Sequence, residues 1–200
     1  MIHKTIITFA FLLYYAISFS QYTWTNGEVI LKNGNTFSGE VKIPVVSKDL
    51  IHFNGKSKVK VKDKITGNKS VFDAGEVDFI KFVFSEREIA YFKYIPVSKK
   101  KREIFCIVTT GAVTLYGRSV SMTTTRPGTF TFNHLNEFYV RRAKEDIATP
   151  LLTARPSKSF KSRAMDYFSD CPTLVEKLKN KTFRKEDIVA VVEHYNNCSK

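Results

Sequence analysis

The stretch EVILKNG, residues 28–34, predicts a β-strand that ends in a tight turn. Its apolar run ends at Asn33-Gly34, and the chain continues as a second strand-like segment from Thr36 to Ile43. Asn and Gly both tolerate positive φ, so an Asn-Gly pair between two such runs is a strong hairpin signal. Pro44 ends the second strand. The chain therefore begins its folded part as antiparallel β-structure.

The same alternation of short apolar runs and turn residues continues to about Leu152. About ten short strands with regularly spaced turns favour an antiparallel, barrel- or sandwich-like sheet over a parallel α/β design. No glycine-rich phosphate loop follows any of them. Beyond the hairpin, the expected strands are Leu50–Phe53, Lys58–Val61, Lys69–Phe72, Val77–Phe84, Ile89–Ile95, Ile104–Thr109, Ala112–Tyr116, two Thr-rich segments around Arg126-Pro127-Gly128, and Phe138–Val140.

Helices are expected after the strands. Residues 153–158 form a linker, and 159–168 a short helix. Asp170-Cys171-Pro172 is typical of a helix start, and the apolar positions from Ile188 to Tyr195 repeat at helical spacing. Two antiparallel helices place Cys171 beside Cys198, so we expect these two to form a disulfide that closes a helical hairpin. The fold class is α+β.

The N-terminus is typical of a secretory signal. His3 and Lys4 precede an apolar stretch that is too short to span a bilayer, and Ser18-Phe19-Ser20 precedes Gln21 as a small-x-small cleavage site. We expect a signal peptide at 1–20, a β-rich domain at 21–152, the linker at 153–158 and a helical tail at 159–200. The mature protein would then be periplasmic, on the outer-membrane surface or secreted, without a transmembrane segment.

Charge points to an anionic partner, because the chain carries a formal net charge of +13. Every second residue is lysine at Lys56, Lys58, Lys60, Lys62 and Lys64, so in a strand these side chains project from one face. Such a row is suited to phosphates or sulfates. The alternative is that the lysines protect a sheet edge from pairing. Two further basic segments would add to the positive potential of this row if the fold brings them close to it. They are the loop from Lys99 to Arg102 and the pair Arg141-Arg142.

Signals for catalysis are weak. His52, His134 and His194 are far apart in the sequence, so we expect no metal site. The acidic run from Asp73 to Asp78 lacks the ligand pattern of a calcium loop and is interpreted as a turn. No Gly-x-Ser-x-Gly elbow occurs, and Cys106, in an apolar strand, is expected to be free, buried and inert. No cofactor is expected.

Several segments resemble, in the same order, a group of uncharacterised secreted β-rich proteins of the Bacteroidota. The resemblance implies a bacterial envelope location and a β-rich fold, and it brings no catalytic residues. The segments that carry it are Val29–Gly34 with Gly39-Glu40-Val41, Phe72-x-Ala74-x-Glu76-Val77, Gly111-x-Val113-x-Leu115-Tyr116, the tail motifs Tyr167-Phe168-x-Asp170-Cys171-Pro172 and Tyr195-Asn196-x-Cys198, and the junction Ser18–Gln21.

Two functions remain open. The first is a non-catalytic secreted or envelope protein that binds an anionic glycan, lipopolysaccharide or an envelope protein through a basic face. The second is a secreted hydrolase whose site is assembled only in three dimensions. Nucleic acid is disfavoured as a partner, since the basic segments lack interleaved aromatic residues. A flat basic face would favour the binder, and a concave pocket with histidine or paired carboxylates would favour the enzyme.

Overall fold

The computed structural model describes residues 24–43, 58–86, 88–126, 129–153 and 157–198, with the side chains of 84–85, 88 and 119–136 left aside. The expected signal peptide, the start at Gln21, the strand at Leu50–Phe53 and Lys56 lie outside the described residues. None of the described helices is long and apolar enough to cross a bilayer.

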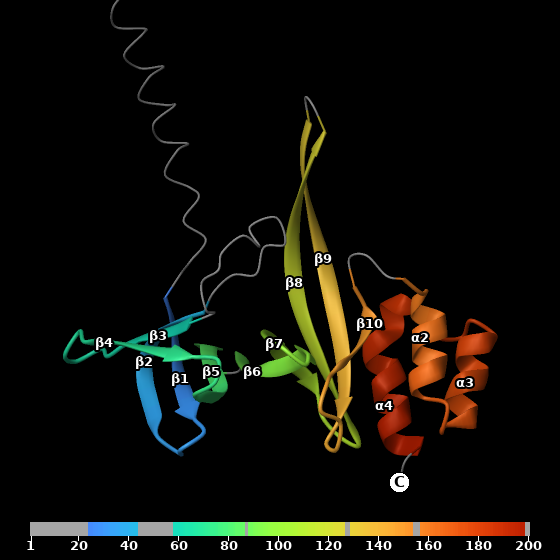
Figure 1. Cartoon of the computed structure of the whole chain (residues 1–200), viewed down its shortest axis with the longest axis horizontal. Helices are drawn as coiled ribbons and strands as arrows, with labels where there is room; N and C mark the ends of the chain where they lie inside the picture. Colours follow the sequence, from blue (N-terminus) through green and yellow to red (C-terminus); the bar gives the residue numbers. More distant parts are fainter. Residues whose placement is uncertain (1–23, 44–57, 87, 127–128, 154–156, 199–200) are drawn as a thin grey trace, which may run out of the picture.

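In the described residues, ten antiparallel strands form one continuous sheet (Figure 1). Its order is β10-β9-β8-β7-β6-β5-β1-β2-β3-β4, so β10 and β4 are the two ends. The strands are β1 (Thr25–Leu31), β2 (Thr36–Lys42), β3 (Lys58–Lys62), β4 (Lys69–Asp73), β5 (Val77–Ser85), β6 (Glu88–Ser98), β7 (Lys101–Thr109), β8 (Val113–Arg126), β9 (Thr129–Arg142) and β10 (Thr149–Leu152).

The Asn33-Gly34 turn joins β1 to β2 as expected. Gly34 has a φ of 87°, in the left-handed region, and Gly34 N–H donates to Leu31 O at 2.9 Å. Two boundaries differ from the sequence expectation. The Thr-rich segments are not separate short strands but parts of β8 and β9, each of 14 residues, because nothing between Val113 and Arg126 interrupts the β-pattern. The strand β10 was not expected, since it is short and contains Pro150.

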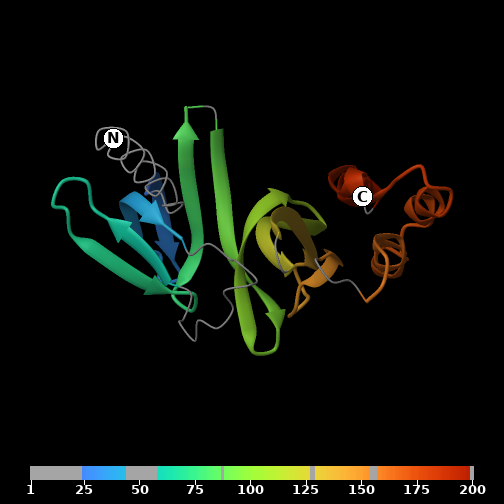
Figure 2. The ribbon, with the colours of Figure 1, turned by 90° about the horizontal axis from the view of Figure 1, so that it is seen from above.

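The first half of the sheet buries one face, and the second half buries both. In β1 to β7 the face that carries Val29, Ile80 and Tyr94 encloses one apolar cluster. In the other half the opposite face buries Phe105 and Tyr116 in a second cluster. The N–H of Ala148 donates to Pro96 O at 2.8 Å, which ties the connection before β10 back to the end of β6. Figure 2 shows these halves as two separately curled lobes.

The helical tail covers the remaining face of β8 and β9. It comprises α2 (Phe160–Tyr167), α3 (Pro172–Lys179), the 3₁₀ turn η2 (Lys185–Asp187) and α4 (Ile188–Cys198). Ser159 caps α2, because its hydroxyl accepts from Ser162 N–H at 3.2 Å. The tail packs on the sheet through one cluster that includes Val113, Leu115 and Val140 from the strands and Leu174 from α3. The α+β prediction is confirmed.

Candidate functional site

The predicted lysine row divides between a strand and a turn. Lys58, Lys60 and Lys62 lie on β3 and alternate with the buried residues Val59 and Val61. Their side chains therefore share one face of the sheet, as expected. Lys64 lies beyond the strand, in the β3–β4 turn.

The edge-protection interpretation of this row is wrong. β3 pairs with β2 on one side and with β4 on the other, so it is an interior strand. The edge strand is β4. Because β4 pairs with β3, the backbone N–H and C=O groups of β3 are not exposed to pairing with another chain.

The neighbouring strands add lysines that the sequence analysis missed. In the register of the sheet, Lys42 of β2 lies opposite Lys60, and Lys69 of β4 lies opposite Lys62. Directly opposed residues on adjacent strands project from the same face. We call this surface, made of Lys42, Lys58, Lys60, Lys62 and Lys69, the lysine face. Only the strand register identifies Lys42 and Lys69 as its members.

Acidic side chains neutralise part of the lysine face. Lys62 Nζ lies 3.3 Å from Glu40 Oε2, and Lys58 Nζ lies 3.9 Å from Asp73 Oδ1. Lys60 is exposed and forms no ion pair with any acidic residue in the described part of the chain. Lys60 is therefore the member of the lysine face whose charge is most available to a ligand.

The other basic segments do not join the lysine face. Lys99 and Lys100 form the β6–β7 turn, and β2, β1 and β5 separate β3 from β6. The expected loop is shorter than predicted, because Lys101 and Arg102 belong to β7. Lys101 forms an ion pair with Glu103, and Arg102 Nη2 donates to Tyr94 O at 3.0 Å.

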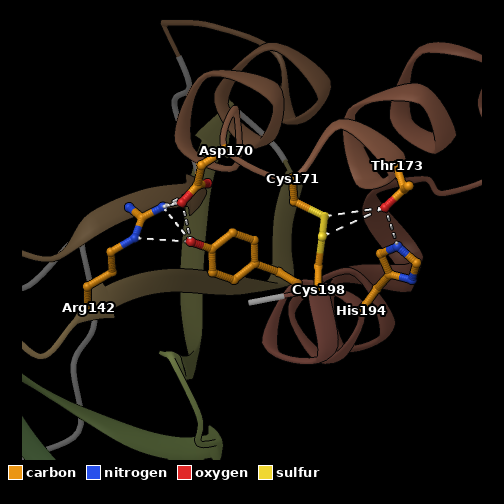
Figure 3. The surroundings of a disulfide bond; sticks show 7 residues. Arg142, Asp170, Cys171, Thr173, His194 and Cys198 are labelled. Carbon is orange, nitrogen blue, oxygen red and sulfur yellow. Dashed lines mark hydrogen bonds and ion pairs between the residues drawn. A yellow bond between two sulfur atoms is a disulfide. The ribbon is translucent and has the colours of Figure 1, made fainter. Parts of the chain in front are cut away.

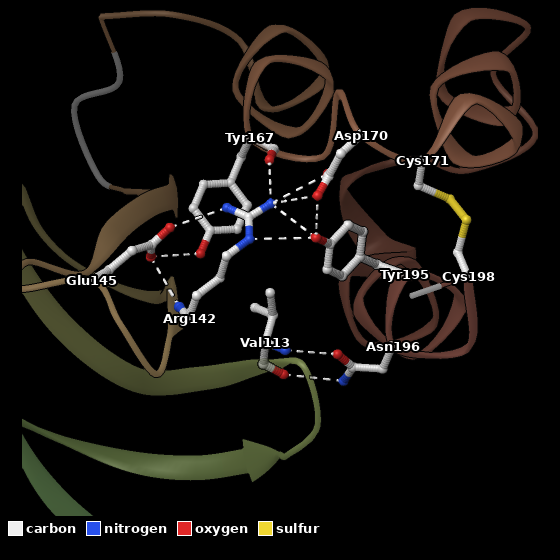
Figure 4. Close-up of polar contacts among 9 residues, drawn as sticks. All are labelled: Val113, Arg142, Glu145, Tyr167, Asp170, Cys171, Tyr195, Asn196 and Cys198. Carbon is white, nitrogen blue, oxygen red and sulfur yellow. Dashed lines mark hydrogen bonds and ion pairs between the residues drawn. A yellow bond between two sulfur atoms is a disulfide. The ribbon is translucent and has the colours of Figure 1, made fainter. Parts of the chain in front are cut away.

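Arg142 does not belong to the lysine face; it attaches the helical tail to the sheet (Figure 4). From the end of β9 its guanidinium donates to Tyr195 Oη at 2.9 Å, to Glu145 Oε1 at 3.0 Å and to the Tyr167 carbonyl at 3.0 Å, and it lies 3.3 Å from Asp170 Oδ1. Burial alone would lower its pKa, but the hydrogen bonds to Tyr195 and Glu145 hold the pKa above the usual value. This residue therefore joins the sheet, α2 and α4.

The acids and phenols around Arg142 have shifted pKa values. The hydrogen bond from the Tyr195 hydroxyl, 2.6 Å long, lowers the pKa of Asp170. Burial would raise the pKa of Glu145, but hydrogen bonds from the Arg142 backbone, the Tyr167 hydroxyl and the Arg142 side chain lower it. Burial and the hydrogen bond to Glu145 raise the pKa of Tyr167. Both carboxylates are thus stabilised in their charged form.

The disulfide between Cys171 and Cys198 is confirmed (Figure 3). It joins the residue before α3 to the end of α4, with the Cα atoms 6.2 Å apart. Thr173 Oγ1 lies 3.5 Å from the Cys171 sulfur and 3.4 Å from His194 Nε2. Burial, followed by the charge of Lys177, lowers the pKa of His194.

Cys106 is free, as predicted, but it is only partly buried. The prediction of a buried thiol was therefore wrong. Partial burial still raises the pKa of the Cys106 thiol, so the thiolate is disfavoured.

A buried ionic cluster lies at the base of the long β8–β9 hairpin. The side chain of Glu137 is 1% exposed and that of Arg118 is 9% exposed. Arg118 Nη2 lies 2.7 Å from Glu137 Oε2 and also pairs with Glu103. The guanidinium stacks over the Phe105 ring, 4.4 Å from its centroid. Both carboxylates are therefore occupied by the same arginine.

The other residues considered for chemistry are those of the acidic turn and the histidines. Asp73 and Glu76 form a turn, with Asp73 N–H donating to Glu76 Oε2 at 2.7 Å, as the sequence predicted. Within the described residues no group of three metal-ligating side chains occurs. His52 lies outside the described residues, and His134 lies on β9.

Solvent-open cavities occur near both ends of the described part of the chain. One of about 430 Å³ lies beside the β3–β4 turn, with Gly27, Gly39, Lys64 and Ile65 in its lining. Another, of about 270 Å³, lies between the β7–β8 turn and Glu193 and Asn196 of α4. Neither lining contains a histidine.

Searches against family models, curated proteins and solved structures found no match to this chain.

Proposed function

We propose that this protein is a non-catalytic, extracytoplasmic binding protein whose lysine face binds a surface with repeated phosphate or sulfate groups. The observation that carries the proposal is the pairing of like charges. Lys42 lies opposite Lys60, and Lys62 lies opposite Lys69. Directly opposed like charges destabilise a sheet. A bound polyanion would offset this cost by placing negative charge beside Lys60, which forms no ion pair with an acidic residue of the described part of the chain.

The shape of the lysine face also supports a repeated ligand. Alternate lysines on β3 are spaced by about 6.6 Å, twice the rise per residue of a strand. Lysines on three adjacent strands widen the row into a patch. Ionic contacts of exposed lysines with a charged polymer are individually weak but act together.

The extracytoplasmic location is part of the proposal. Disulfides persist in oxidising compartments and are rare in the cytosol, and Cys171 and Cys198 form one here. The N-terminal sequence has the pattern of a secretory signal. N-terminal sequencing of the protein from the envelope or medium is expected to give Gln21 as the first residue, whereas an intact Met1 in the cytoplasm would contradict export.

The alternative function is a hydrolase, for which the best candidates in the described part of the chain are Glu103 and Glu137. Both bind Arg118 in the buried cluster. An acid–base pair needs a carboxyl group that is available to substrate. The ion pairs with Arg118 therefore make the binding protein the better-supported function.

The test is direct binding to dextran sulfate and to lipopolysaccharide. The double variant Lys42→Gln/Lys60→Gln removes one opposed pair, together with the contact of Lys42 Nζ over the Trp24 ring, 5.9 Å from its centroid. A control, Lys158→Gln/Lys185→Gln, removes the same charge from exposed positions of the tail. We expect the first variant to bind at least tenfold more weakly and the control to bind as the unmodified protein does. Equal affinities for the two variants would exclude the lysine face as the binding surface.

A further inference from the structure

The β3–β4 turn exposes an isoleucine between lysines. Ile65 is 96% exposed, the highest value among the large hydrophobic side chains of the described residues. Lys64 precedes it, and Lys62 and Lys69 end the two strands that the turn connects. We propose that this turn inserts Ile65 into the interfacial region of an anionic lipid layer while the lysine face binds the lipid phosphates. The inference rests on the proposed function and names its partner.

Hydrogen bonds hold the turn in one conformation. The Asp63 carboxylate accepts from Ile65 N–H at 2.9 Å, from Thr66 N–H at 2.7 Å and from Thr66 Oγ1 at 3.0 Å. Gly67, with a φ of 71°, donates its N–H to Asp63 O at 3.0 Å. Ile65 is thus presented to solvent by an ordered turn, so little conformational freedom remains to be lost on binding.

The turn is also accessible to a flat surface. In both views of the ribbon the β3–β4 hairpin projects at the end of the molecule that lies opposite the helices (Figures 1 and 2). Lys60 and Lys62, on the same hairpin, are within one to three strand positions of the turn. The apolar tip and the cations can therefore meet one surface together.

An exposed isoleucine beside several lysines favours a lipid layer over a soluble polyanion as the ligand. A sulfated or phosphorylated polymer satisfies the lysines but provides no apolar phase for Ile65. Reversible attachment to a membrane generally needs two signals, one apolar and one electrostatic. Lysines near an anionic leaflet each strengthen binding by about fivefold, and burial of one aliphatic side chain by about tenfold.

The experiment measures co-sedimentation of the protein with vesicles of phosphatidylglycerol and phosphatidylcholine, and with vesicles of phosphatidylcholine alone. Ile65→Ser removes the apolar tip, and Val189→Ser is the control, since Val189 is a partly exposed aliphatic residue of α4. Binding of dextran sulfate by the same proteins is measured in parallel. Ile65→Trp adds a fluorescent probe at the tip, with the unmodified protein as the baseline for Trp24.

We expect Ile65→Ser to bind anionic vesicles about tenfold more weakly and to bind dextran sulfate unchanged. We also expect vesicles to shift the emission of Ile65→Trp to shorter wavelength. Vesicle binding that is unaffected by Ile65→Ser, or dextran sulfate binding without any vesicle binding, would overturn the membrane inference and leave the proposed function standing. Failure to bind either ligand would overturn both.

Discussion

Lys42 and Lys60 lie directly opposite each other on β2 and β3. They project from one face, and Lys60 has no acidic partner among the described residues. Sheets usually place opposite charges at such positions, because like charges there reduce stability. The pair therefore provides a stability measurement that is independent of any ligand.

Lys60→Glu is expected to raise the free energy of unfolding by about 0.5 kcal/mol, since it replaces a repulsive cross-strand pair with an attractive one. Urea denaturation at low salt measures the change, and the difference should shrink at high salt because exposed charges are screened. Lys60→Gln should lie between the two. A loss of stability in Lys60→Glu would show that the lysine pair is not repulsive.

Arg142→Met is expected to lower the free energy of unfolding by about 2–3 kcal/mol. The variant removes the donor shared by Tyr195, Glu145 and the Tyr167 carbonyl, so these partly buried acceptors lose several charge-assisted hydrogen bonds at once. Urea denaturation measures the loss. Arg141→Met, one residue earlier on β9, serves as the control for removing one arginine. A similar stability for both variants would contradict the anchoring role of Arg142.

The stability of the tail is expected to fall in acid. Asp170 and Glu145 have folded-state pKa values below their usual values of 3.8 and 4.5. Their contribution to stability is therefore present above those usual values and is lost as the pH falls through the lower, folded-state values. Unfolding free energies measured from pH 7 to pH 2 should decline below about pH 4.5. Asp170→Asn should flatten this decline, and an unchanged profile in that variant would show that Asp170 does not contribute to it.

Reduction of the Cys171–Cys198 disulfide is expected to lower the free energy of unfolding by about 3.5 kcal/mol. This value is the chain-entropy estimate for a sequence separation of 27 residues. Thermal unfolding with and without reductant measures the change, and Cys171→Ser/Cys198→Ser should reproduce it without reductant. Cys106→Ser is the control, because this cysteine forms no disulfide. If reductant lowers the melting temperature equally in the double-serine variant, the effect does not come from this disulfide.

Local signals in the sequence predicted much of the fold. Asn33-Gly34 defined the first hairpin, and the apolar spacing from Ile188 to Tyr195 defined α4. The same spacing placed Cys171 beside Cys198. The strand β10 could not be predicted, because its four residues are stabilised by pairing with β9 and carry no pattern of their own. Long-range pairing is a property of the whole sheet.

The candidate site was predictable only in part. The lysine at every second position identified Lys58, Lys60 and Lys62, because a strand places alternate side chains on one face whichever strands lie beside it. Lys42 and Lys69 joined the lysine face through the register of β2 and β4. The same register showed β3 to be interior, which no local pattern reveals. The separation of Arg142 from this face likewise follows from the strand order.

The salt dependence of binding to dextran sulfate measures whether the lysine face binds a polyanion. The logarithm of the affinity should fall linearly with the logarithm of salt concentration, because ionic contacts release counterions. For Lys42→Gln/Lys60→Gln the slope should be smaller by about 1 to 2, since each lost contact reduces it by about 1. The control Lys158→Gln/Lys185→Gln should keep the full slope. A slope that is the same in both double variants would contradict the lysine face as the site of binding.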